Sequence, residues 1–133
     1  MVHLQRTRPV AEARPHAFGT RSIFDNYLSN GLEINEVRVI GGVAVKSQLL
    51  RELLADALQM EIKLVDQEQC CALGAAMFAA VAGGLHADLA AAQAAMAPGI
   101  RGVTAPDPAR REQSERLYRK YRELVAFEEK REK

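Results

Sequence analysis

The stretch Val37–Leu58, "VRVIGGVAVKSQLLRELLADAL", joins an apolar strand to an amphipathic helix through two adjacent glycines. Val37 and Val39 stand at alternate positions, which is typical of a short β-strand. Beyond Gly41–Gly42, apolar residues recur at helical spacing and form one stripe, which comprises Leu49, Leu50, Leu53, Leu54, Ala57 and Leu58. We therefore predict a strand, a tight glycine turn and a helix that packs by this stripe on a sheet.

A second strand and a second glycine-bearing helix follow. Ile62–Val65, "IKLV", is predicted to be a strand, and the long connection from the first strand favours a parallel pair with a right-handed crossover. Ala72–Gly84, "ALGAAMFAAVAGG", has the composition of a helix built from very small residues, which ends at Gly83–Gly84. Small side chains allow close packing, so we expect this helix to be buried.

The flanking segments complete the predicted architecture. Apolar residues at helical spacing predict a helix from Ala17 to Asn30–Gly31, and Asp88 is placed to cap another that ends at Met96. The Pro- and Gly-rich segment 97–108 is expected to be a loop, and a charge-mixed helix runs from Ala109 to the end. The fold class is therefore α/β, with two short parallel strands and about five helices.

The amino-terminal residues differ in character from the rest of the chain. Residues 1–16 are rich in Arg and Pro and show neither a helical nor a strand period. We expect them to form a disordered lead-in and residues 17–133 to form the domain.

Composition excludes several classes of function. Eighteen basic residues balance seventeen acidic ones in 133 residues, so neither a nucleic acid nor a membrane surface is an expected partner. The two cysteines, Cys70 and Cys71, are neighbours, which suits neither a disulfide framework nor a CxxC metal site. Because the sequence shows neither a membrane-spanning run nor a signal peptide, we expect a cytoplasmic protein.

The glycine pair has a structural and a functional interpretation. Glycine is the usual residue where a strand bends sharply into a helix. A backbone without Cβ atoms also lets a flat base or a ribose approach the first amides of the helix. Lys46 is either a charge for a ligand or a solvated residue, and Ser47 is either a ligand contact or a helix cap. The second small-residue helix start, Ala72–Ala76, lies where it would close the other side of the same crevice.

Taken together, these motifs resemble the FGGY family of carbohydrate kinases. That family's adenosine motif is a Gly-Gly turn followed by a helix that ends in Ala-Asp, and its next hallmark is ALGAA. This chain has Gly41–Gly42, Ala55–Asp56 and Ala72–Ala76 in that order. Within the family, "AFGTRSIFD", "IGGVAVKS", "QCCALGAAMFAAVAGGLHADLAAAQ" and "RLYRKYREL" resemble the carboxyl end of the ribulokinases, as does Gln69 in place of the commoner Glu.

The resemblance implies a fold, a reaction and a site. The fold would be part of an actin-like, ribonuclease H-like ATPase subdomain, with the sugar held mainly by a separate amino-terminal domain. Gly41, Gly42, Val43 and Lys46 would bind the adenosine end of ATP, and the ALGAA helix would buttress them. The complete enzyme would use ATP and Mg²⁺ to convert L-ribulose to L-ribulose 5-phosphate and ADP in arabinose catabolism.

The sequence assigns no catalytic residue and no metal ligand. The family's first phosphate loop is absent, and each aspartate is better explained as a solvated residue or a cap than as a general base; these are Asp25, Asp56, Asp66, Asp88 and Asp107. His86 has no second ligand at metal spacing, so we expect a structural role. Cys70 and Cys71 are expected to be small packing residues.

Three alternatives follow for the chain itself. Resemblance is lost abruptly before Ala17, which favours the nucleotide-side portion of a ribulokinase-like enzyme that is inactive by itself. A second alternative is an interaction module that pairs through exposed apolar surface, as a homo-oligomer or with a split partner. A third, an NAD-type Rossmann domain, is weakened because "GGVAVK" lacks the third glycine of GxGxxG.

Overall fold

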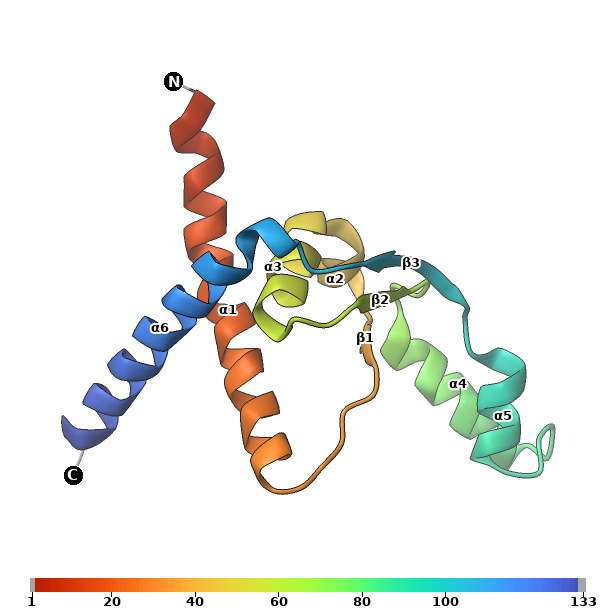
Figure 1. Ribbon diagram of the computed structural model, residues 1–133. Coiled ribbons are helices and arrows are strands. Elements are labelled where there is room, and N and C mark those ends of the chain that lie inside the picture. Colours follow the sequence, from red (N-terminus) through yellow and green to blue (C-terminus); the bar gives the residue numbers. More distant parts are fainter. Residues whose placement is uncertain (1, 132–133) are drawn as a thin grey trace.

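A small three-stranded sheet links a helical cluster to a projecting helical hairpin (Figure 1). The computed structural model describes residues 2–131, with the side chains of residues 13–43 and 45–131. Strand β1 (Val37–Val39) pairs in parallel with β2 (Ile62–Val65), and Val37 lies opposite Ile62. The predicted parallel pair is therefore confirmed.

The third strand was not expected from the sequence. β3 (Ile100–Thr104) pairs antiparallel with β2, with Thr104 opposite Ile62, and the register shifts between Leu64 and Val65. The prediction of a loop throughout residues 97–108 is therefore wrong. Gly99 and Gly102 give this segment the composition of a turn, but the free edge of β2 offers its backbone a ladder of hydrogen bonds.

All five predicted helices are present, and a short one is added inside the glycine turn. The helices are α1 (Val2–Ser29), α2 (Gly42–Lys46), α3 (Gln48–Leu58), α4 (Cys70–Ala82), α5 (Leu89–Met96) and α6 (Arg111–Arg131), with a 3₁₀ turn, η1, at Pro108–Arg110. Asp88 caps α5 as predicted, because its carboxylate accepts a hydrogen bond from the Ala91 amide at 2.8 Å. Among the described residues, none of the helices is both long and apolar enough to span a bilayer.

Helix α1 extends further toward the amino terminus than predicted. It begins at Val2, whereas the predicted helix began at Ala17. Ala13 packs against the helical core and Ala17 is fully buried, which anchors the helix on both sides of the expected boundary. The division into a lead-in and a domain stays a prediction, and its outermost residues, 1 and 132–133, lie outside the described residues.

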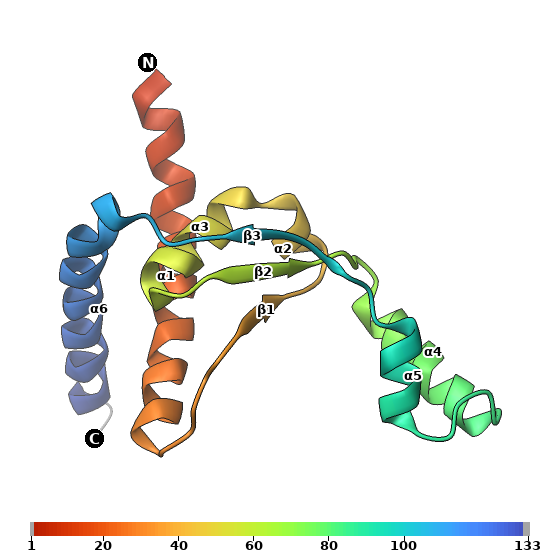
Figure 2. The ribbon, with the colours of Figure 1, turned by 45° about the vertical axis from the view of Figure 1, so that its right-hand side comes forward.

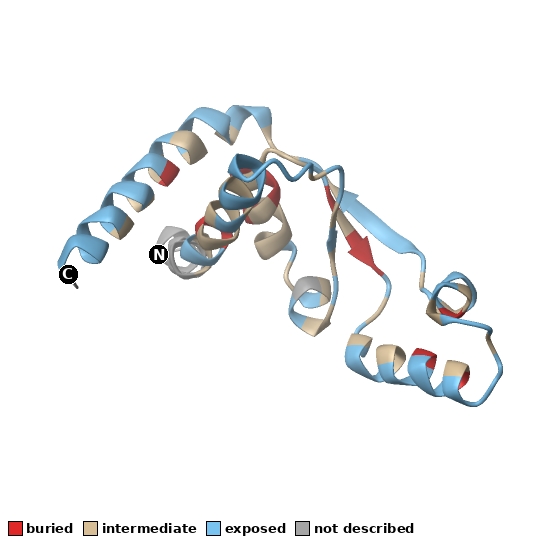
Figure 3. Ribbon diagram, turned by 90° about the horizontal axis from the view of Figure 1, so that it is seen from below, coloured by how far each residue is buried: buried red, intermediate tan, exposed pale blue. Residues whose placement is uncertain are grey.

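The main core lies between α1, α3 and α6. Its buried members are Ala17, Phe18, Leu53, Ala57 and Tyr118. Figure 3 shows buried residues in these helices, in β2 and also in α4 and α5. Ile62 of β2 has no exposed surface. This arrangement fixes the start of α3, and therefore the glycine turn that precedes it, on a packed support.

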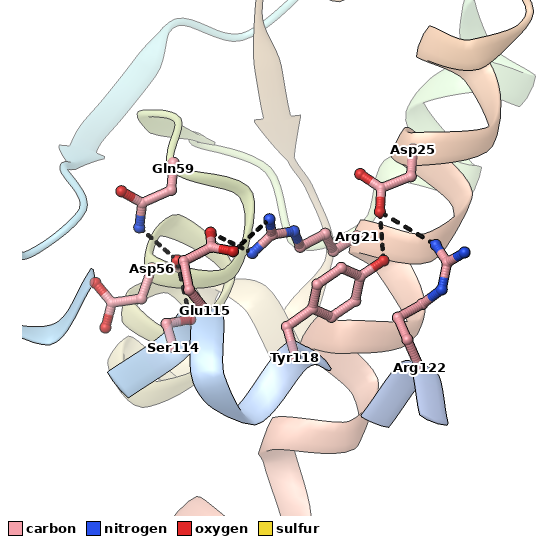
Figure 4. A network of polar contacts seen from close by, with 8 residues as sticks. All are labelled: Arg21, Asp25, Asp56, Gln59, Ser114, Glu115, Tyr118 and Arg122. Carbon is pink, nitrogen blue, oxygen red and sulfur yellow. Dashed lines mark hydrogen bonds and ion pairs between the residues drawn. The ribbon is translucent and has the colours of Figure 1, made fainter. Parts of the chain in front are cut away.

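A polar cluster joins α1 to α6, and we call it the α1–α6 clamp: Arg21, Asp25, Glu115, Tyr118 and Arg122 (Figure 4). The Arg21 guanidinium donates two hydrogen bonds to Glu115, at 2.7 and 3.0 Å, and lies 4.1 Å from the centre of the Tyr118 ring. The Tyr118 hydroxyl donates to Asp25 at 2.5 Å, and Arg122 also reaches Asp25. Burial and the adjacent Asp25 carboxylate raise the pKa of Tyr118.

Helices α4 and α5 form a hairpin that projects from the sheet (Figure 2). They contact each other, and Met77, Ala80 and Ala92 are buried between them. The expectation that the small-residue helix is buried is nevertheless wrong, since Phe78 is 63% exposed and most of the alanines of α4 face outward. Small residues permit close packing, but they do not specify which neighbour supplies it.

Candidate functional site

The glycine turn between β1 and α2 has a backbone conformation that favours glycine. Gly41 has φ 88° and ψ 164°, a region that residues with a Cβ atom adopt only with strain. Its amide donates a hydrogen bond to the carbonyl of Gln67 at 3.3 Å, which ties the turn to the segment after β2. The turn is therefore held between the ends of two parallel strands.

The start of α4 lies against the same turn. A Cβ atom at Gly41 would lie 3.8 Å from the sulfur of Cys70, the first residue of α4. The Gly-Gly motif and the helix that carries ALGAA therefore meet at the carboxyl ends of β1 and β2. In open α/β sheets, this edge is where ligands bind.

The four predicted site residues lie together on α2 and the residue before it. A Cβ atom at Gly42 would meet no atom within 4 Å, and the Val43 side chain is 72% exposed. Lys46 is exposed at the last position of α2. The turn thus leaves open space at Gly42 and exposes an apolar side chain, Val43, and a cation, Lys46.

Two residues after the turn make hydrogen bonds next to it, and the contact of one of them was not predicted from the sequence. Ser47 accepts a hydrogen bond from the Leu50 amide at 3.2 Å, so of its two interpretations the helix cap is observed. Arg51 donates to the carbonyl of Val45 at 3.0 Å. In the sequence, Arg51 lies on the polar face opposite the apolar stripe of α3, and no local spacing rule links residues six apart.

Asp56 plays a different structural role from the predicted one. It is only 5% exposed; its carboxylate accepts a hydrogen bond from the Asp107 amide at 2.8 Å and lies 3.1 Å from Arg110. Its carbonyl accepts from Ser114 and Gln59, as Figure 4 shows. Asp56 is therefore neither solvated nor a helix cap, and it fastens the end of α3 to the segment before α6.

The remaining aspartates divide between caps and ion pairs. Asp107 caps η1 through the Ala109 amide at 2.9 Å, as expected of a capping residue. Asp66 is exposed and lies 3.6 Å from Arg101, whereas Asp25 belongs to the α1–α6 clamp. Each of these aspartates therefore has a structural or solvated role.

The described residues do not fit a metal site of their own. Throughout residues 13–43 and 45–131, no three His, Cys, Asp or Glu side chains come close enough together to hold an ion. Cys70 is half-buried beside the turn, but Cys71 is exposed, so the expectation that both are packing residues fails for Cys71.

Residues 14–83 match the family model for the carboxyl-terminal domain of the FGGY family of carbohydrate kinases. The chain belongs to this family. The match includes both the Gly41–Gly42 turn and Ala72–Ala76, the two motifs that meet at the sheet edge. The family identified from the sequence is thus confirmed, and its members are carbohydrate kinases.

Ribulokinases are among the relatives of this FGGY chain. The ribulokinase of Vibrio parahaemolyticus serotype O3:K6 is 39% identical over 108 residues, which cover 81% of this chain and 19% of that protein. The ribulokinase of Geobacillus thermodenitrificans is 47% identical over 68 residues, which cover 51% of this chain and 12% of that protein. The chain therefore spans about a fifth or less of the length of these relatives.

Solved structures of FGGY-type sugar kinases share the fold. The xylulose kinase from Rhodospirillum rubrum superposes with a TM-score of 0.68 at 26% identity, covering 86% of this chain and 23% of that one. The gluconate kinase from Lactobacillus acidophilus gives a TM-score of 0.54 at 27% identity, covering 66% of this chain and 18% of that one. The predicted fold class, part of an actin-like ATPase subdomain, is therefore confirmed.

Proposed function

We propose that this chain is the nucleotide-binding part of an ATP-dependent kinase that phosphorylates L-ribulose. The observation that carries the proposal is the glycine turn at the carboxyl ends of β1 and β2, where Gly41 has φ 88° and lies against Cys70 of α4. A turn without side chains there leaves room for a nucleoside at an edge of the sheet suited to ligands.

Each predicted site residue has a distinct role in this proposal. Gly41 and Gly42 let the ribose and the base approach the backbone. The exposed side chain of Val43 covers the apolar face of the base, and Lys46 places a positive charge beside the nucleotide. The start of α4 forms the opposite wall.

The sugar and the reaction belong to the same proposal. The reaction converts L-ribulose and ATP to L-ribulose 5-phosphate and ADP, in the cytoplasm and for arabinose catabolism, with the sugar bound by another part of a longer kinase. Support comes from the relatives, whose names specify ribulokinase. Mg²⁺ would neutralise charge on the phosphates, but no ligand for it is assigned to the described residues.

Replacing Gly42 with valine is expected to weaken ADP binding at least tenfold without unfolding the chain. The added side chain meets no protein atom within 4 Å of its Cβ position, whereas it occupies the space proposed for the nucleoside. Titration of the isotope-labelled 133-residue chain with ADP, followed through backbone amide chemical shifts, measures the effect. In the wild type we expect shifts concentrated in residues 41–46 and 70–76.

Gly99→Val is the matched control for this substitution. Gly99 also has no atom within 4 Å of its Cβ position, and it lies in the loop before β3. The control is expected to retain wild-type affinity for ADP. An unchanged affinity in Gly42→Val, or the absence of any response in the wild type at millimolar ADP, would refute nucleotide binding at this turn.

The choice of ribulose is tested with two hybrid enzymes. This chain replaces the matching segment of either the Vibrio parahaemolyticus ribulokinase or the Rhodospirillum rubrum xylulose kinase. The chain is 39% identical to the ribulokinase and 26% identical to the xylulose kinase. Its buried contacts should therefore fit the rest of the ribulokinase better. We expect sugar-dependent ADP release within tenfold of the parent in the ribulokinase hybrid and at least a hundredfold loss in the other. Equal sugar-dependent ADP release by the two hybrid enzymes, relative to their parents, would contradict the ribulose assignment.

A further inference from the structure

Helix α2 carries most of the proposed site but is too short to be stable by itself. It has five residues, about one and a half turns, and isolated helices of fewer than about twelve residues are marginal in water. Its backbone hydrogen bonds include Val45 to the carbonyl of Gly41 and Ser47 to the carbonyl of Val43, both at 3.0 Å. Its orientation must therefore come from its surroundings.

Arg51 supplies such a support from the neighbouring helix. Its Nη1 atom donates a hydrogen bond to the carbonyl of Val45 at 3.0 Å, and both residues are half-buried. The last carbonyls of a helix have no partner within the helix, and a cation favours that end of the helix dipole. One guanidinium therefore satisfies an otherwise unpaired acceptor and opposes fraying of α2.

The geometry also connects Arg51 to a rigid part of the molecule. Arg51 lies on α3, whose Leu53 and Ala57 belong to the buried core, and its own amide bonds to the carbonyl of Ser47 at 3.4 Å. The Arg51 side chain thus reaches from the packed helix back over the Ser47 cap to the end of α2. Gly41 is fixed from the other side by its hydrogen bond to Gln67.

We propose that Arg51 is a positioning residue that holds α2 in the orientation needed for nucleotide binding. This inference rests on the proposed function, because the orientation matters only if the nucleotide binds at the turn. Arg51 need not touch the nucleotide, since it acts through the backbone of Val45.

The first test measures the support itself, in the chain without nucleotide. Arg51→Met keeps the apolar stem and removes the donors, so amide hydrogen exchange at Val45 and Ser47 is expected to accelerate at least tenfold. Exchange of amides in the middle of α3, such as Leu54, is expected to stay within twofold. Arg51→Lys retains a donor and is expected to restore most of the protection, whereas equal exchange in Arg51→Met and the wild type would overturn the inference.

The second test measures the consequence for binding. Arg51→Met is expected to weaken ADP binding at least tenfold and Arg51→Lys less than threefold, with the same unfolding midpoint in both. Arg38→Met is the matched control, because Arg38 is an exposed arginine on β1 that pairs with Glu36. It should bind ADP like the wild type.

The outcomes separate this inference from the proposed function. If the wild type binds ADP and Arg51→Met binds equally well, the positioning role is wrong and nucleotide binding stands. If the wild type does not bind ADP, the proposed function is wrong, and so is the role of Arg51 in nucleotide binding. In that case, the exchange rates still decide whether Arg51 holds α2.

Discussion

Tyr118→Ala is expected to lower the free energy of unfolding by about 3–5 kcal/mol, the range for removing a buried aromatic side chain. Tyr118 is 5% exposed and is the one described residue of α6 that is buried. Its ring centre lies 5.5 Å from that of Phe18 and 6.1 Å from that of Tyr121, and its hydroxyl bonds to Asp25. The substitution therefore removes both the packing and the central member of the α1–α6 clamp.

Urea denaturation followed by circular dichroism measures this loss. Tyr27→Ala is the matched control, since Tyr27 is 46% exposed at the far end of α1 and its removal should cost under about 0.5 kcal/mol. Tyr118→Phe removes only the hydroxyl and should cost about 1 kcal/mol. If Tyr118→Ala is as stable as Tyr27→Ala, then α6 is not docked through this residue.

The raised pKa of Tyr118 adds a pH dependence with a definite sign. The folded state favours the neutral phenol, so this contribution to stability is complete below the ordinary pKa of 10.0. It is lost as the pH rises through the higher pKa of the folded state. Wild-type stability should therefore fall more steeply above pH 10 than that of Tyr118→Phe, in which the group is absent.

Asp56→Ala is expected to cost about 2 kcal/mol, because removing the buried carboxylate leaves a hydrogen-bond donor without its acceptor. The Asp107 amide would lose its acceptor, and Arg110 would lose one of its nearby carboxylates. The Ala-Asp pair of the FGGY motif would thus act here by fastening α3 to the start of α6. Thermal and urea unfolding measure the effect.

Two comparisons distinguish this structural role from a role in binding. Asp66→Ala is the control, because Asp66 is exposed and its ion pair with Arg101, at 3.6 Å, is exposed as well. This substitution should lower the free energy of unfolding by under about 0.5 kcal/mol. At a temperature where Asp56→Ala remains folded, its affinity for ADP should stay within threefold of the wild type. A large loss of affinity in the folded variant would place Asp56 in the site instead.

Much of the candidate site could be predicted from the sequence because its features are local. The alternation of Val37 and Val39, the glycine pair and the apolar stripe of α3 occupy consecutive residues, and each acts through backbone conformation or helical period. The same holds for the cap at Asp88. The parallel pairing of β1 with β2 followed from the length of their connection.

The residues that support the site could not be predicted in this way. Arg51 reaches Val45 across a helix cap, Asp56 meets Asp107 after 51 residues, and Arg21 meets Glu115 after 94. No periodic pattern relates such partners, because their contact exists only once the helices have packed. The exposure of α4 likewise depends on which neighbours are present, and not on its own composition.

By itself, then, the sequence determined the family, the strand–glycine–helix turn and the helical periods, because each depends on residues that are close together in the sequence. Only the tertiary structure decided that β3 completes the sheet, that α1 and α6 are clamped through Tyr118, and that Arg51 supports the turn. The physical reason is that long-range hydrogen bonds and packing depend on the relative placement of whole elements, which short-range propensities leave open.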